Sequence, residues 1–100
     1  MIRALLILCL MSTLATSAHA QSGGCYVDYK AQRTAGGQLQ LHYGVMQLGN
    51  RACNNASVAK RTVAQRIGAD GWKLLRVVSR FDRGGLQSRR ANAGKYFLRY

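Results

Sequence analysis

The sequence predicts an α+β domain: a small antiparallel sheet in the order β-β-α-β-β, with one helix packed on one face and one disulfide. Three observations predict it. Two stretches that alternate apolar and polar side chains flank a Gly-Gly turn. An apolar stripe with helical spacing follows them, and a run rich in Leu and Val comes next. The domain is expected to cover residues 21–100. Since one helix cannot cover both faces of four strands, part of the sheet should stay bare.

The first 20 residues have the plan of a secretory signal peptide. Arg3 gives a positive start, residues 4–11 are an unbroken apolar run, and Ala18 and Ala20 place small side chains where signal peptidase needs them. The apolar run is shorter than the roughly 20 residues that cross a bilayer. We therefore expect residues 1–20 to be cleaved and the mature protein to be exported, to the periplasm or to the medium.

Two stretches of the mature chain, residues 25–32 and residues 38–45, alternate apolar and polar side chains. A period of two residues is typical of strands with one buried face. Residues 34–37 between them, Thr-Ala-Gly-Gly, have the composition of a turn. We expect an antiparallel hairpin whose ends meet near residue 25.

Cys25 and Cys53 are the cysteines that remain after cleavage. An exported protein meets an oxidising compartment, so a disulfide between them is expected. The predicted hairpin also returns residues 46–48 to Cys25, shortly before Cys53. The closed loop would stabilise the fold by about 3–4 kcal/mol through the entropy of the unfolded chain. Two free thiols or an intermolecular bridge are the alternatives.

An amphipathic helix is predicted over residues 56–67. Its apolar stripe repeats every four residues, at Ala59, Val63 and Ile67. Three residues offer a side-chain oxygen that can cap the first turn: Asn54, Asn55 and Ser57. Gly68 is expected to take the left-handed conformation that stops the helix.

Residues 72–81 give the strongest strand pattern of the chain because they are rich in Leu and Val. Gly71 ends a tight turn before them, and Trp72 opens the strand. Residues 82–94 are expected to form a loop. Residues 95–100, with aromatic side chains at alternate positions, are expected to form the last strand.

Residues 67–78 contain the pattern Gly-x-x-Gly-Trp followed by a hydrophobic strand, and residues 95–100 are aromatic and basic. This arrangement resembles a widespread bacterial family of small domains of unknown function. The resemblance implies a strand, helix, strand, strand unit and no activity. Its shared positions have structural explanations, as helix stop, turn and core anchor: Gly68, Gly71 and Trp72. The chain departs from the family in its signal peptide, its cysteine pair and Lys73, where an acidic residue is common.

The mature chain is strongly basic. The full sequence has 15 Lys or Arg and 3 Asp or Glu, and removal of Arg3 leaves 14 cations against three Asp, a net charge of +11. Such a field attracts phosphates, sulfates and anionic lipid headgroups. We expect anion binding in and beside the long loop, at four residues: Arg83, Arg89, Arg90 and Lys95. The alternative is a soluble surface whose Arg content reflects genome composition.

The residues favour no catalytic or metal site. His42 is the only histidine of the mature chain, and it has no metal-ligand spacing with the three Asp. We expect no cofactor. A hydrolase would need His42, expected on the solvated face of a strand, to activate a serine, with an Asp to orient it. The residues available for these roles are Ser57, Ser79, Ser88, Asp28 and Asp82.

The sequence therefore predicts a non-enzymatic binding module for an anionic partner: envelope polysaccharide, lipid headgroup, nucleic acid or an acidic protein. A second hypothesis is a structural or protein-interaction accessory that uses a sheet edge or a bare sheet face, with self-association included. A third is a small hydrolase or nuclease centred on His42.

Overall fold

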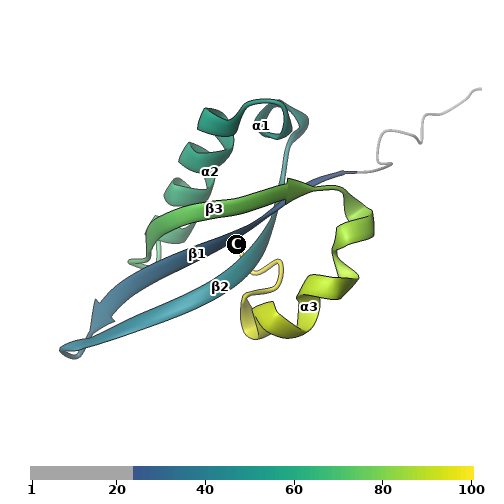
Figure 1. Ribbon diagram of the computed structural model, residues 1–100. Coiled ribbons are helices and arrows are strands. Elements are labelled where there is room, and N and C mark those ends of the chain that lie inside the picture. Colours follow the sequence, from purple (N-terminus) through teal and green to yellow (C-terminus); the bar gives the residue numbers. More distant parts are fainter. Residues whose placement is uncertain (1–23) are drawn as a thin grey trace, which may run out of the picture.

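The structure is a computed structural model that describes residues 24–100 (Figure 1). It confirms the α+β class, the antiparallel sheet and the disulfide. The predicted signal peptide, residues 1–20, lies outside the described residues. The elements follow in the order β1 (Cys25–Ala35), β2 (Gln38–Leu48), α1 (Asn50–Cys53), α2 (Ala56–Gly68), β3 (Lys73–Phe81), η2 (Arg83–Gly85), α3 (Gln87–Ala93) and η3 (Gly94–Tyr96).

The sheet has the order β2-β1-β3, and both strand pairs are antiparallel. The predicted hairpin is present, and its register runs unbroken from Cys25↔Leu48 to Ala35↔Gln38. Gly36 and Gly37 make the two-residue turn because both take positive φ, 59° and 78°, which the tight hairpin turn needs. Pairing of β1 with β3 contains two irregularities, so β3 carries extra residues relative to β1.

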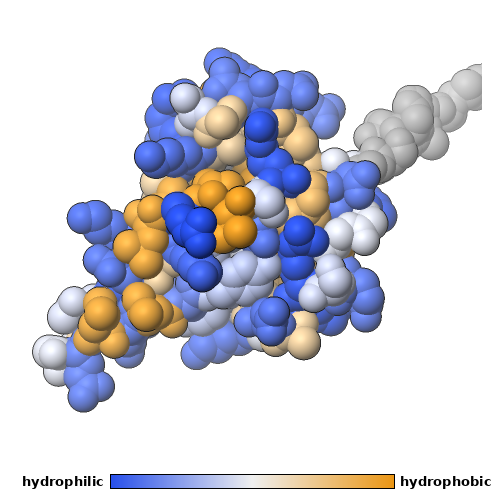
Figure 2. All heavy atoms as spheres, viewed as in Figure 1, coloured by the Kyte–Doolittle hydropathy of each residue, from blue (hydrophilic) through white to orange (hydrophobic). Residues whose placement is uncertain are grey.

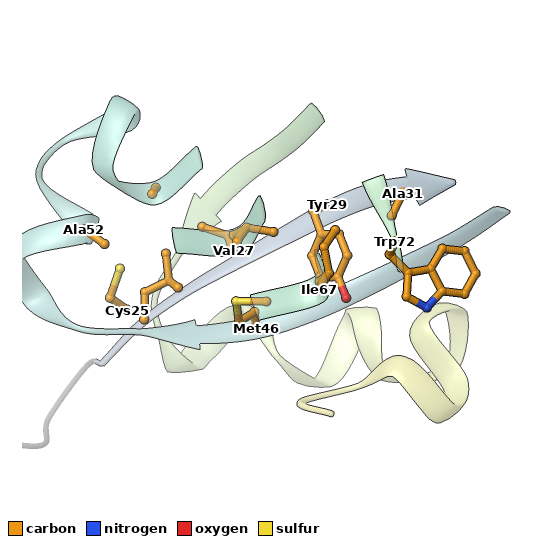
Figure 3. Packing of buried hydrophobic residues seen from close by; sticks show 11 residues of the cluster. Cys25, Val27, Tyr29, Ala31, Met46, Ala52, Ile67 and Trp72 are labelled. Atoms are coloured by element: carbon orange, nitrogen blue, oxygen red, sulfur yellow. The ribbon is translucent and has the colours of Figure 1, made fainter. Parts of the chain in front are cut away.

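α2 covers one face of the sheet, which we call the helix face; it carries Val27, Tyr29, Ala31 and Met46. The helix stripe is as predicted, since Ala59, Val63 and Ile67 are all buried. Of the three candidate caps, Asn55 is the one used: its Oδ1 accepts a hydrogen bond from Val58 N at 3.1 Å. Figure 3 shows the buried cluster, with Cys25 and Ala52 at one end and Trp72 at the other.

The helix ends differently from the prediction. Gly68 is the last residue of α2, and Ala69 after it is right-handed. The left-handed residue is Gly71, at φ 84°. Gly71 N donates to Gly68 O at 2.9 Å and Trp72 N to Ile67 O at 3.2 Å. The left-handed residue therefore lies three positions later than predicted. The turn that it makes places the backbone of Trp72 beside the end of α2.

The disulfide joins Cys25, the first residue of β1, to Cys53, the last of α1, with the two Cα atoms 5.6 Å apart. Cys25 is 1% exposed, so the bond is part of the core. It holds the start of the hairpin against the segment that leads into α2. The predicted pairing is thus confirmed.

The prediction for residues 82–100 was wrong in two respects. The expected loop contains η2 and α3, and the expected last strand is absent, so the sheet has three strands. The only ladder contact of this segment is a single parallel bridge between Phe97 and Val45. The reason is that Gly94 and Leu98 both have positive φ, 54° and 55°, and turn the chain at both ends of the stretch.

α3 packs against the sheet face opposite α2 (Figure 1). We call this the open face, because α3 covers only part of it; its residues include Asp28, Lys30, Leu41 and Tyr43. After α3 the chain passes the outer edge of β2, where Leu98 N donates to Val45 O at 2.8 Å. The C-terminal residues thereby reach the helix face. No helix within residues 24–100 is long and apolar enough to cross a membrane.

Candidate functional site: a basic, aromatic groove

His42 lies on the helix face and is 8% exposed, so its expected place on a solvated face was wrong. It pairs with Ala31, two residues along the hairpin from the Tyr29↔Gly44 pair and on the same face. A Cβ on Gly44 would lie 2.5 Å from Tyr29 Cζ, so only glycine leaves room for the ring. Tyr29 therefore lies across Gly44, and its Oη shares a hydrogen bond of 2.9 Å with His42 Nε2.

Aromatic rings from three separate segments surround His42. Tyr96 from η3 stacks on the imidazole at 3.7 Å between centroids and 10° between planes. Trp72, which follows α2, meets it edge-on at 4.2 Å. Tyr100 lies further out at 6.4 Å. Stacked and edge-on geometries of this kind add to the stability gained from burial, so His42 is the point where the C-terminal segment attaches to the hairpin.

The imidazole is uncharged at neutral pH. Burial, with smaller contributions from the nearby charges of Arg33 and Lys95, lowers the pKa of His42 to about 4. Burial likewise raises the pKa of the Tyr29 hydroxyl, with smaller effects of Tyr100 and Tyr96. The Nδ1 atom of His42 is buried and has no hydrogen-bond partner among the described residues. The aromatic cluster is thus a neutral platform beneath a charged rim.

Three cations form that rim. The Arg33 guanidinium lies over the Trp72 ring at 4.2 Å, and Nη1 donates to Asp70 O at 2.9 Å. Lys95 Nζ lies 5.4 Å from the centroid of Tyr96, and the Arg99 guanidinium lies 5.7 Å from that of Tyr100. Lys95 and Arg99 are exposed. A flat aromatic floor with cationic sides can hold a ligand that presents both an anionic group and a flat or apolar face.

The rim encloses two adjoining depressions of about 280 and 410 Å³. Both are lined by the same four residues: Arg33, Trp72, Lys95 and Tyr96. We call them together the groove. The smaller one also contains the Asp70 carboxylate, whose Oδ2 accepts a hydrogen bond of 2.7 Å from Tyr100 Oη. Three cations against one carboxylate leave the groove positive.

The predicted anion-binding residues do not form one cluster. Lys95 lines the groove. Arg90 lies over the Phe97 ring at 4.5 Å, and Arg83 is in η2. Arg89 is directed into the protein: its Nε donates to Asp28 Oδ2 at 3.1 Å and its Nη1 to Gly85 O at 2.8 Å. Its charge is therefore used to attach α3 to the sheet.

Asp28 is the buried partner in that ion pair and is 4% exposed. It also accepts hydrogen bonds from Ser79 Oγ at 2.6 Å and Tyr43 Oη at 2.8 Å. Burial by itself raises the pKa of Asp28, but the hydrogen bonds from Ser79, Tyr43 and Arg89 outweigh it and hold the pKa below the usual value. The bond to Asp28 contributes to raising the pKa of Tyr43 to about 12, after burial.

The residues considered for hydrolysis are divided between the two faces. Ser79 and Asp28 are bonded to each other on the open face, whereas His42 lies on the helix face. Asp82 caps η2, where its Oδ1 accepts from Gly84 N at 2.9 Å. Within the part of the chain that is described, no group of three His, Cys, Asp or Glu side chains could hold a metal.

A larger depression of about 800 Å³ lies between the α1–α2 corner and the end of β3. Its lining cation, Arg80, donates from Nη1 to Cys53 O at 2.6 Å, and its carboxylate, Asp82, caps η2. The charges there already serve the fold. The groove is therefore the better candidate site, because Lys95 and Arg99 extend their charges into solvent.

Arg33 and Arg99, which line the groove, and His42, which packs against its rings, were not predicted as parts of the site. The hairpin register places Arg33 opposite Gln40 and on the same face as His42, and this much follows from alternation. No pattern in the sequence predicts that the C-terminal segment returns to this face of the sheet.

A scan of protein-family models found no match, and neither did a search of curated proteins or of solved structures. The site is therefore interpreted from its own chemistry.

Proposed function

We propose that the protein is a small exported, non-enzymatic module that binds an anionic partner, and that the groove is where it binds. The observation that carries the proposal is the meeting of three cations, Arg33, Lys95 and Arg99, around the aromatic floor of Trp72 and Tyr96. These residues come from the hairpin, the turn before β3 and the C-terminus. Their charges converge on one hollow rather than being spread over the surface.

The chemistry of the groove favours a sulfated, phosphorylated or carboxylated ligand with a flat face. Arg and Lys bind such anions through charge-assisted hydrogen bonds. The half-buried ring of Tyr96 adds stacking area that a simple ion cannot use, while Trp72, 5% exposed and covered by Arg33, supports it from below. The proposed partner is therefore an anionic polymer or glycan of the cell envelope rather than an inorganic ion. Export, on which this partner depends, is predicted by residues 1–20.

Heparin, a sulfated glycan, is a suitable probe. We expect the Lys95→Gln/Arg99→Gln double variant to bind it roughly tenfold more weakly at physiological salt, equivalent to about 1.4 kcal/mol. The matched control is Arg51→Gln/Lys60→Gln, which removes the same charge from exposed positions of α1 and α2 outside the groove. Calorimetry over a range of salt concentrations measures both.

The control variant separates a site from a general charge effect. If the two double variants weaken binding equally, heparin responds only to the net charge and the groove is not the binding site. If wild-type protein binds so weakly that low salt releases it, the proposed function is wrong.

A further inference from the structure

Large apolar side chains remain uncovered at the hairpin end of the open face. Leu39 and Leu41 are 62% and 66% exposed, and Leu75 on β3 is 48% exposed. Alternation along β2 places Leu39 and Leu41 on the same side as Tyr43. Leu41 and Leu75 line one depression of about 300 Å³ with Tyr43 and Lys30. Figure 2 shows apolar atoms gathered over this end of the hairpin.

α3 leaves this region bare because it is attached at the other end of the open face. Arg89 fixes it to Asp28, which pairs with Val45 toward the Cys25 end of the hairpin. The strands continue from there to the turn at Gly36 and Gly37 without a helix above them on this side (Figure 1). We call the exposed leucines Leu39, Leu41 and Leu75 the leucine patch.

Cations surround the leucine patch. Lys30 and Arg76 are direct cross-strand partners on the open face, and Lys73 pairs with Gln32 on the same face. All three cations are exposed. The carboxylate that the register places on this face, Asp28, is 4% exposed and bound to Arg89. The surface thus presents apolar side chains at its centre, positive charge beside them and no accessible negative charge from Asp28.

This combination discriminates between occupants. A second copy would bring Lys30, Lys73 and Arg76 against the same residues of its partner, and like charges facing each other oppose association. A free polyanion would satisfy the cations but leave the leucines in water. A bilayer with anionic lipids offers a partner for both kinds of side chain: phosphates at the surface for the cations, and acyl chains directly below for the leucines.

We propose that the hairpin half of the open face docks on an anionic lipid bilayer. Leu39, Leu41 and Leu75 enter the boundary between headgroups and acyl chains, and the three cations bind lipid phosphates around them. Lys and Arg side chains are suited to this because their aliphatic stems remain in the apolar layer. The proposal goes beyond the function proposed above, since the cations of the groove lie on the other side of the hairpin. Leu41 is the patch residue that the two surfaces share, because it also lines the larger depression of the groove.

Vesicle flotation tests the proposal with the processed chain recovered after export. Wild-type protein is expected to float with vesicles of phosphatidylglycerol and phosphatidylcholine and to stay behind with phosphatidylcholine alone. Leu39→Ser/Leu75→Ser, which leaves the groove residue Leu41 unchanged, is expected to reduce partitioning roughly tenfold or more, because two exposed leucines lose their burial in the acyl layer. Val78→Ser/Leu98→Ser, a double change at exposed apolar positions outside the leucine patch, should float like wild type.

A second pair of variants tests the charges. Lys30→Gln/Arg76→Gln should lose binding to phosphatidylglycerol vesicles, whereas Arg51→Gln/Lys60→Gln should lose little. Since all four leucine and cation positions are exposed, these variants are expected to fold. Equal flotation of the leucine variant and wild type overturns the proposal, and so does failure of wild-type protein to float.

Two further outcomes separate this surface from the alternatives. If only Lys95→Gln/Arg99→Gln abolishes flotation, lipid binds at the groove; the proposed function then survives and the leucine patch does not carry docking. If wild-type protein forms a dimer in sedimentation without lipid, and Leu39→Ser/Leu75→Ser makes it monomeric, the occupant is a second copy and the lipid proposal is wrong.

Discussion

His42 illustrates at the scale of one residue how packing changes chemistry. Its ring is enclosed by Tyr96, Trp72 and Tyr29, and burial together with two nearby cations keeps it neutral. A neutral imidazole can stack closely between aromatic rings without the cost of burying a charge. The residue that looked like the mature chain's only general base therefore serves to attach the C-terminal segment and to support the Trp72 and Tyr96 rings that form the floor of the groove.

The stability of the fold should consequently fall in mild acid. The pKa of His42 is about 4 in the folded protein and 6.5 in the unfolded chain, so unfolding takes up a proton between these values. The stabilisation is complete above pH 6.5 and is lost as pH falls toward 4. Unfolding in urea should show a loss of roughly 2–3 kcal/mol between about pH 7 and 4.5.

This window separates His42 from Asp28, whose pKa lies below its usual 3.8 and whose stabilisation is lost only at lower pH. Direct titration of the imidazole by NMR is the check. An imidazole that titrates near 6.5, with an unchanged urea midpoint at pH 4.5, would contradict the buried position of His42.

Alternation along residues 38–45 assigns each side chain to a face, but it does not say which face is covered. His42 shares its face with Ala31 and Tyr29, which are both buried. The rings that enclose it, Tyr96 and Tyr100, come from more than 50 residues away in the sequence. The pattern of residues 38–45 therefore predicts that His42 lies on a strand, but not that aromatic rings enclose it.

At the scale of elements, the hairpin, α2 and β3 were predictable because each is encoded by a local period. α3 was not: its residues, Gln87–Ala93, contain no apolar stripe. Its attachment depends instead on side-chain contacts of arginine: the long-range ion pair of Arg89 with Asp28, and the contacts of Arg89 with the Phe81 ring and of Arg90 with the Phe97 ring. Such contacts have no periodic signature in a sequence.

The disulfide makes the hairpin and the start of α2 depend on each other. Cys25→Ala/Cys53→Ala should lower the free energy of unfolding by about 3–4 kcal/mol, because the two cysteines are 28 positions apart and the unfolded chain regains the freedom of that loop. The measurement is the urea midpoint of the variant beside that of wild-type protein. Wild-type protein treated with a reductant is the matched control and should unfold at the same midpoint as the variant. An unchanged midpoint after reduction would show that the bond adds nothing to the fold.

At the scale of the whole molecule, the three carboxylates are all used within the fold. Asp28 binds Arg89, Asp70 accepts from Tyr100 and Asp82 caps η2. The Lys and Arg side chains far outnumber these three carboxylates, so the outer surface is positive on both faces of the sheet. The net charge could be predicted from composition alone. Its division between the groove on one face and the leucine patch on the other required the three-dimensional arrangement.

The central claim, that an anionic ligand binds in the groove, is tested most directly by an NMR titration of the folded protein with a heparin oligosaccharide at physiological salt. The account predicts that the indole N–H of Trp72 and the amides of Tyr96, Lys95 and Arg99 shift together and saturate. Shifts spread over Arg51 and Lys60 with Trp72 unmoved would contradict it.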